Sequence, residues 1–398
     1  HQIVVTDPDL LRELLVEQHE ALTRWPRGMQ VFSRLYGHSV FIAEGQAWRN
    51  KRLALAPGFS RQAAWDAAPA IVAVAERQLA RWPQQHPHWR IDQALTTLAM
   101  ETIAQLLFSC ALDHAAEPTA QAVQTVLAAS QAELYWPASW PDWLPWKSAK
   151  RRARLLLDGV IQRQLHARLA LADSAWPDDL LSRWLRLHHA NPTDWPLAAV
   201  RDECMTTFLA GHETTAATLA WWAWDLACHP QAQADARTEV TRVLQGRPPC
   251  AADLPALTTL RHTLEETLRL HPAAPVLSTR RAIRPVPLGP WQLPAGTLFL
   301  LPVQLLHHDP RQFDAPLGFC PERFATAPAS AHPAYQPFGR GPRVCLGQHL
   351  AMTEMTLIAA MLLQRRQLSV ADGVSAPRAV LKVSLRPEPG VYVRLAPV

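Results

Sequence analysis

The sequence predicts a mainly helical protein that folds as one large domain with a few small β elements. Apolar residues recur at three- and four-residue spacing over the first two-thirds of the chain, and short strand-like segments with proline and glycine turns follow. The 398 residues are 48% hydrophobic, which allows a large buried core. No Gly/Ser-rich linker or block of like charge divides the chain, so we interpret residues 1–398 as a single domain.

The longest apolar segment, residues 197–227, predicts a central helix. It follows Asp194 and Pro196 and precedes Pro230, and such residues mark helix ends. At about 1.5 Å per residue this helix is roughly 45 Å long. Because it is apolar on most faces, we expect it to be buried and to cross the whole domain. A second helix is expected over residues 255–270, with a leucine stripe on one face.

Small β elements are expected at the two ends of the chain. The opening residues predict a strand followed directly by a helix. Residues 286–293 and 297–301 flank a Pro-Ala-Gly turn, which predicts a hairpin. Residues 380–385 and 391–395 flank a second turn and predict another hairpin. The Trp-rich stretch 136–146 is broken by prolines and predicts a loop between helices.

Charge and cysteine content exclude several classes of function. Lys and Arg number 39 against 34 acidic residues, a formal excess of +5, which is too small to indicate nucleic acid binding. No run of about 20 apolar residues is visible, so no membrane segment is expected. The six cysteines lack disulfide spacing, which favours a reducing, cytoplasmic location. Because the chain starts inside a folded element, its N-terminal segment is expected to be incomplete.

The most specific motif is the stretch 338–347, FGRGPRVCLG, which a helical pattern follows. It places Cys345 on a glycine-rich turn that opens a helix. Glycines allow positive φ angles and a close approach to a flat ligand, and amides at a helix start stabilise a thiolate. An isolated cysteine is usually a small buried hydrophobe, but a basic, glycine-rich turn suits a metal ligand better.

This stretch resembles the ligand loop of the cytochrome P450 family, FxxGxRxCxG. Every fixed position is filled, by Phe338, Gly341, Arg343, Cys345 and Gly347. The resemblance implies the cytochrome P450 fold, of a soluble, bacterial-like member, and haem as the cofactor (heme b, iron protoporphyrin IX). It also implies that Cys345 is the axial ligand of the iron. In the family, the matching phenylalanine packs beside the sulfur and the matching arginine pairs with a haem propionate.

The long helix contains Ala210, Gly211, Glu213 and Thr214. A glycine inside a helix costs about 1 kcal/mol relative to alanine, and close approach of a cofactor or of dioxygen is one reason for it. The resemblance places this helix over the distal face of the haem, where the matching acid and threonine relay protons. The alternative is that Thr214 bonds a carbonyl one turn back while Glu213 faces solvent.

Glu266 and Arg269 lie three apart on the second helix and can pair. Surface pairs of this kind are common and contribute little. The family carries the same pair, joined by an arginine from a later segment, which is here Arg323. The resemblance therefore implies that these three residues support the haem-ligand region and do not act in catalysis.

Three further residues are expected to contact the haem propionates. Trp48 and Arg52 lie four apart on one helical face and match the WxxxR of the family; the planar fork of arginine suits a carboxylate. Taken alone, the pair indicates packing and a surface charge. Arg280 aligns with another propionate contact, although a shift of one residue would give that role to Arg281.

The resemblance implies a monooxygenase that inserts one atom of dioxygen into a hydrophobic small molecule. No reductase motif follows the haem domain, so electrons are expected from a separate donor, a ferredoxin with its reductase. A basic patch that includes Arg340, Arg343, Arg49 and Lys51 is a candidate docking surface. Two alternatives remain: a peroxide-driven peroxygenase, which the acid–threonine pair disfavours, and a non-catalytic haem-binding protein.

Variable loops and edges are expected to line the substrate pocket. They are residues 33–41, the Trp-rich stretch 136–146, Phe208 and Ala210, residues 274–277, and the tip of the final hairpin.

Overall fold

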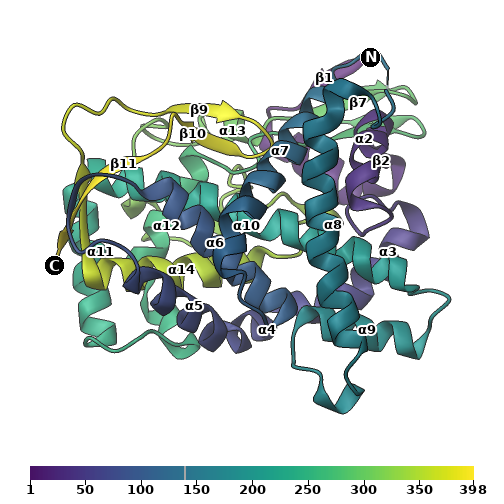
Figure 1. Cartoon of the computed structure of the whole chain (residues 1–398). Helices are drawn as coiled ribbons and strands as arrows, with labels where there is room; N and C mark the ends of the chain where they lie inside the picture. Colours follow the sequence, from purple (N-terminus) through teal and green to yellow (C-terminus); the bar gives the residue numbers. More distant parts are fainter. Residues whose placement is uncertain (139) are drawn as a thin grey trace.

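The protein is organised around one long helix, α10 (Leu197–Cys228), in a computed structural model that describes residues 1–138 and 140–398. This confirms the predicted central helix, which extends one residue further than expected. Helix α10 packs along α6 (Ile91–Phe108), and both run through the middle of the molecule (Figure 1). Most residues of α10 are buried, so the helix serves as the spine on which the site is built.

The remaining helices surround this pair. They are α1 (Pro8–Arg12), α2 (Pro26–Tyr36), α3 (Gly45–Leu55), α4 (Arg61–Asp66), α5 (Ala68–Ala80), α7 (Ala116–Leu134), α8 (Ser148–Leu169), α9 (Leu180–Ala190), α11 (Pro230–Leu244), α12 (Thr258–Leu270), α13 (Val303–His307) and α14 (Gln348–Arg365).

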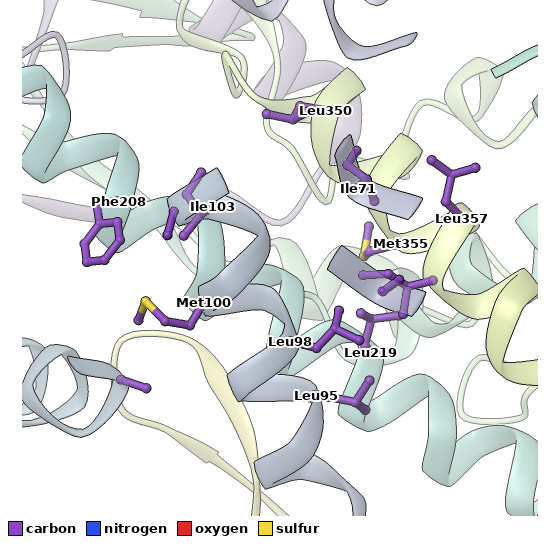
Figure 2. Packing of buried hydrophobic residues seen from close by; sticks show 14 of the residues in the cluster. Ile71, Leu95, Leu98, Met100, Ile103, Phe208, Leu219, Leu350, Met355 and Leu357 are labelled. Atoms are coloured by element: carbon purple, nitrogen blue, oxygen red, sulfur yellow. The ribbon is translucent and has the colours of Figure 1, made fainter. Parts of the chain in front are cut away.

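One large apolar core holds the helices together. Figure 2 shows side chains that four helices contribute to this core: Ile71 of α5, Ile103 of α6, Phe208 of α10 and Leu357 of α14. All four are nearly inaccessible to solvent. Burial of apolar area on this scale is the dominant force that fixes the helices against one another.

The strands form four small sheets. They are β1 (Gln2–Val4), β2 (Leu22–Arg24), β3 (His86–Arg90), β4 (Leu277–Ala282), β5 (Val286–Leu288), β6 (Trp291–Leu293), β7 (Leu298–Leu301), β8 (Arg366–Val370), β9 (Arg378–Leu381), β10 (Leu385–Glu388) and β11 (Tyr392–Pro397). Strands β1, β7, β4 and β2 make one sheet, in which β1 runs parallel to β7. A mainly helical fold with several small sheets confirms the predicted fold class.

Both predicted hairpin pairings are wrong. Strand β5 pairs with β6 across Gly289 and Pro290, and Pro294 to Gly296 instead lead to β7, which pairs with β1 and β4. Strand β9 pairs with β10, whereas β11 pairs with β3 and β8. Gly289 has a φ of 54°, which suits the tight turn there. Each proline-containing segment that we interpreted as a hairpin turn instead connects strands of two different sheets.

The predicted helix over residues 255–270 begins later than expected. Residues Ala251–Ala256 form a short 3₁₀ turn that contains Pro255, and α12 starts at Thr258. The Glu239 carboxylate accepts hydrogen bonds from the backbone N–H groups of Thr259 and Leu260, at 2.9 and 3.0 Å. Since these N–H groups have no partner inside the helix, Glu239 fixes where α12 begins.

Two further expectations agree with the structure. Strand β1 and helix α1 follow one another at the start of the chain. Between α7 and α8, residues 136–138 and 140–144 form neither helix nor strand; residue 139 of this Trp-rich stretch lies outside the described residues. No single described helix is long and apolar enough to cross a membrane, and one bent pair, Ile91–Phe108 with Asp113–Leu134, passes the same test of length and composition.

Candidate active site

The loop before α14 presents Cys345 in a tightly fixed turn. The Cys345 N–H donates to the Phe338 carbonyl oxygen at 2.9 Å. Gly341 has a φ of 74°, and a Cβ there would lie 2.2 Å from the Leu15 carbonyl oxygen. Only glycine tolerates both conditions. The Cys345 side chain is exposed to the cavity. The enclosing walls desolvate the thiol and raise its pKa, and the Gly347 N–H and the Arg52 guanidinium act in the opposite direction.

A cavity of about 400 Å³ connects this loop to the long central helix. Its wall includes Phe338, Cys345 and Gly347 of the loop. It also includes Gly211 and Thr214 of α10. Among the described cysteines, Cys345 is the one that lines the cavity. The two motifs, more than a hundred residues apart in the chain, therefore face one space.

Gly211 lines the cavity, as expected of a position near a cofactor, and it also has a packing reason to be glycine. A Cβ at this position would lie 2.7 Å from Cδ1 of Ile103, so glycine is required by the close approach of α6 to α10. Ala210 and Thr214 expose their side chains to the cavity. The Thr214 hydroxyl donates to the Ala210 carbonyl oxygen at 3.0 Å, which is the bond one turn back that we considered. The Thr214 side chain nevertheless remains on the cavity wall.

Glu213 faces neither the cavity nor solvent. The residue is 4% exposed. Its carboxylate accepts hydrogen bonds from Ser384 Oγ at 2.7 Å and from Arg386 Nε at 2.5 Å. Burial alone raises the pKa of this carboxyl, but the Arg386 guanidinium outweighs burial and holds the pKa below its ordinary value. Glu213 is therefore a buried carboxylate held against β10.

Arginines make one edge of the cavity strongly basic. Arg24, Arg52, Arg280 and Arg343 all line it. The Arg343 guanidinium lies over the indole of Trp48, at 4.2 Å from the ring centroid, an arrangement that favours a fixed guanidinium. Arg280 is buried, whereas its neighbour Arg281 is exposed. Of the two candidates from the sequence, Arg280 is the one on the cavity wall.

Arg24, on β2, is a cavity residue that the sequence analysis missed. Its Nε and Nη1 are buried without a hydrogen-bond partner, and burial together with Arg343 and Arg280 lowers its pKa to about 9. Glu44 is the carboxylate that offsets these charges, and Arg343 is paired with it. Buried donors without partners are rare in folded proteins. A group with two carboxylates, such as haem with its two propionates, fits this wall.

The pair predicted on α12 forms a buried ion network. Arg269 donates to Glu266 through Nε at 2.9 Å and Nη2 at 2.8 Å, and both side chains are fully buried. Arg323 Nε donates to the same carboxylate at 3.0 Å. The remaining Arg269 donors bond the carbonyl oxygens of His307, Pro316 and Gly318. This network ties α12 to the segment that leads to the Cys345 loop.

Other expected surfaces are placed differently. Lys51 turns inward to Glu203 at 2.9 Å and its side chain is 15% exposed, so it is not part of an exposed basic patch.

Phe208 packs against Phe108 in the core. Neither Phe208 nor any described residue of 136–146 or of the β9–β10 hairpin lines the cavity. Val40, Phe41, Ala274 and Leu277 do line it; Ile103 and Phe59 were missed because nothing in their local pattern distinguishes them from core residues.

Comparison with known proteins agrees with this geometry. The sequence model of the cytochrome P450 family matches residues 1–394. The chain belongs to the cytochrome P450 family. Its activity is accordingly that of a haem-thiolate monooxygenase, and the family implies a haem cofactor with a cysteine thiolate ligand, dioxygen and a redox partner.

Individual relatives span plants and bacteria. A cytokinin hydroxylase of Arabidopsis thaliana is 29% identical over 409 residues, covering 100% of this chain and 79% of the relative. A cyclooctat-9-en-7-ol 5-monooxygenase of Streptomyces melanosporofaciens is 31% identical over 387 residues, covering 92% of this chain and 80% of the relative. A putative cytochrome P450 132 of Mycobacterium bovis is 36% identical over 240 residues, covering 60% of this chain and 50% of the relative.

Proposed function

We propose that the protein inserts one oxygen atom from dioxygen into a hydrophobic small molecule, with haem b bound through Cys345 and electrons supplied by a separate protein. The observation that carries this proposal is that Cys345 and Thr214 line the same cavity. Bound in it, haem would supply the iron at which dioxygen is activated.

The arginine wall would orient the cofactor. Arg24, Arg52, Arg280 and Arg343 offer planar guanidinium donors to the two propionates, and such forks bind carboxylates in pairs. Trp48 supports Arg343 from below its plane. Pairing of these arginines with the propionates would favour one orientation of the cofactor, with Cys345 as its sulfur ligand.

Thr214 and Glu213 are the proposed proton-transfer residues. The Thr214 hydroxyl donates its hydrogen to Ala210, so its lone pairs remain available to accept a hydrogen bond from a group in the cavity. Glu213 is adjacent in sequence and is the nearest acid on α10. In this structure Glu213 is bonded to Ser384 and Arg386, whereas Thr214 lines the cavity. Proton transfer by a group that reaches the reacting atoms typically contributes about 10²- to 10⁴-fold in rate.

An apolar substrate is supported by the rest of the cavity wall. Val40, Phe41, Phe59, Ile103 and Leu277 supply aliphatic and aromatic surface, and pockets of this composition bind hydrophobic ligands with few polar contacts. Two relatives are named for the oxygenation of a small molecule, as a cytokinin hydroxylase and a cyclooctat-9-en-7-ol 5-monooxygenase.

The proposed test follows both atoms of labelled dioxygen. Haem-loaded protein is incubated with ¹⁸O₂, NADPH, a plant-type ferredoxin and its reductase, and with compounds that shift its absorption spectrum on binding. We expect one ¹⁸O atom in the organic product and the other in water. Thr214→Ala should lower product formed per NADPH by about tenfold or more.

The alternative functions give different outcomes. Equal product formation from hydrogen peroxide without any electron donor would identify a peroxygenase. Haem binding without reductant consumption for any compound would identify a non-catalytic haem protein. Either result contradicts the proposal.

Docking of a ferredoxin is proposed at the basic face beside the Cys345 loop. Arg340 lies in that loop. Arg49, whose side chain is 52% exposed and pairs with Glu20 at 2.6 Å, lines the same small surface hollow as Arg340. Arg340→Glu should slow reduction by the ferredoxin about tenfold at low salt and less at high salt, because exposed charges are screened. Arg242→Glu, on the distant helix α11, is the control. An unchanged rate for Arg340→Glu would count against this docking site.

A further inference from the structure

His307, the last residue of α13, is a fully buried histidine that joins two parts of the chain. Its Nδ1 lies 3.0 Å from the Arg269 carbonyl oxygen, and its Nε2 lies 2.9 Å from the backbone nitrogen of Gln336. Because a carbonyl oxygen only accepts and a backbone N–H only donates, the ring carries its proton on Nδ1. His307 therefore donates to α12 and accepts from the segment that leads to Cys345.

The bond to α12 is returned by Arg269 itself. Its Nη1 donates to the His307 carbonyl oxygen at 2.7 Å, and its Nε and Nη2 donate to the buried carboxylate of Glu266. Arg269 and His307 are thus bonded in both directions, each through its side chain to the backbone of the other. This anchors the imidazole to the buried ion network of α12.

Gln336 is joined to the turn that presents Cys345. Its carbonyl oxygen accepts the Gly339 N–H at 3.0 Å, and the Phe338 carbonyl oxygen accepts the Cys345 N–H at 2.9 Å. Pro337 stands between Gln336 and Phe338, and its ring leaves little freedom in φ. A displacement of Gln336 would therefore be passed on to Phe338 and to the Cys345 turn.

Aromatic rings enclose the imidazole of His307. The Tyr335 ring is stacked on it, with centroids 5.5 Å apart and 15° between the planes, and Phe313 meets it edge-on at 6.5 Å. Burial lowers the pKa of His307 to about 3, so the ring is neutral at physiological pH and Nε2 stays an acceptor. A buried N–H that loses its acceptor is costly, so Gln336 would shift if His307 no longer accepted its bond.

We propose that His307 is a positioning residue that acts through the Gln336 N–H to fix the turn around Cys345, and that it thereby sets the geometry in which the sulfur binds the haem iron. The inference rests on the role proposed above for Cys345. It extends that role, because it assigns the orientation of the sulfur to a side chain on another element. Groups that orient a metal ligand from behind typically matter nearly as much as the ligand.

Two substitutions separate the two bonds of His307. In His307→Asn the amide reaches only the position of Nδ1, so the bond to Arg269 is kept and the bond to Gln336 is lost. In His307→Gln the amide oxygen reaches the position of Nε2, so the bond to Gln336 is kept and the bond to Arg269 is lost. Each variant loses one buried hydrogen bond, so we expect similar decreases in melting temperature.

Spectra of the haem-loaded protein report on the sulfur. Resonance Raman spectra of the ferric form give the iron–sulfur stretching band, and the ferrous carbon monoxide complex gives the Soret band. We expect His307→Asn to shift or broaden the iron–sulfur band and to contain several-fold more of the complex that lacks the red-shifted Soret band. His307→Gln should match the wild type in both spectra, although it melts at a similar temperature to His307→Asn.

Equal spectra in the two variants would overturn the positioning role, whether both match the wild type or both depart from it. If His307→Asn takes up no haem, Tyr335→Leu provides the milder disturbance, because it removes the ring stacked on His307. It should broaden the same iron–sulfur band. An unchanged band together with a lowered melting temperature would show that the surroundings of His307 serve stability alone, and would overturn the proposal.

The wild-type spectrum separates this inference from the proposed function. A wild type without the red-shifted Soret band overturns both the role of Cys345 and that of His307. A wild type with that band, whose His307→Asn and His307→Gln variants are alike, leaves Cys345 as the ligand and overturns the role of His307 only.

Discussion

Glu354 of α14 is a carboxyl buried on the cavity wall, and one of its oxygens has no hydrogen-bond partner. Burial raises its pKa to about 8, against about 4.3 for an exposed glutamate. Its contribution to stability is therefore complete below about pH 4.3 and is lost as pH rises toward 8. The loss amounts to at most about 1.4 kcal/mol per pH unit.

Glu354→Gln should remove this pH dependence, because an amide does not ionise. We expect the free energy of unfolding of the variant, measured in urea, to equal that of the wild type near pH 4.5 and to exceed it at pH 8. Glu117→Gln, at an exposed site on α7, is the matched control. Its free energy of unfolding should differ from that of the wild type by the same amount at every pH. A Glu354→Gln curve parallel to the wild type would refute the raised pKa.

The Glu266–Arg269–Arg323 network gives a second residue-scale prediction. Glu266→Gln removes the charge that balances the fully buried Arg269, and breaking a buried pair typically costs about 3–5 kcal/mol. We expect a loss of this size in the free energy of unfolding. Arg311→Ala, which removes an exposed guanidinium from its surface pair with Asp309, should cost less than about 1 kcal/mol. Similar losses for the two variants would argue against a structural role for the network.

At this scale, motif residues were predictable and isolated ones were not. Cys345 and Glu266 stand in fixed spacing with neighbours that share their chemistry. Arg24 and Arg386 are single arginines, and their environment is created by segments far away in the chain: Arg343 for one, Glu213 for the other. No local pattern records such a contact, so the sequence alone could not single them out.

At the scale of elements, the contact between α6 and α10 depends on Gly211. Ile103 occupies the space that a side chain would need. Gly211→Ala would gain about 1 kcal/mol of helix propensity but would force overpacking that costs about 1–3 kcal/mol. We therefore expect no net stabilisation, and Ile103→Val in the same protein should relieve the clash.

Gly159→Ala on α8 is the matched control. A Cβ there would meet the flexible end of Arg163 at 3.5 Å, so the propensity gain of about 1 kcal/mol should appear in full. Thermal unfolding of the three variants distinguishes the two sites. Equal stabilisation at positions 159 and 211 would show that the close helix contact is not what requires Gly211.

Helices were easier to predict from the sequence than strand partners. The apolar pattern of α10 is long and bounded by prolines, so its position follows from local residues. Strand β7 pairs with β1 from the other end of the chain, and β11 pairs with β3. Such long-range partners leave no trace in the residues of a short strand, which is why both hairpin predictions paired the wrong strands.

For the whole molecule, the fold brings together three distant parts of the chain. The N-terminal region supplies Arg24 and Trp48, the central helix supplies Thr214, and the loop before α14 supplies Cys345. The large helical core fixes these parts relative to one another, so one cavity is basic at its edge and apolar elsewhere. This arrangement supports the proposal that the cofactor and the substrate bind in the same space.

The central claim is that Cys345 is the thiolate ligand of a haem. The most direct test is the carbon monoxide difference spectrum of the reduced, haem-loaded protein, with the wild type compared with Cys345→Ser. We expect a strongly red-shifted Soret band in the wild type that is lost in the variant, because the thiolate donates electron density to the iron. A wild-type band typical of histidine ligation, or an unchanged band in Cys345→Ser, would contradict the claim.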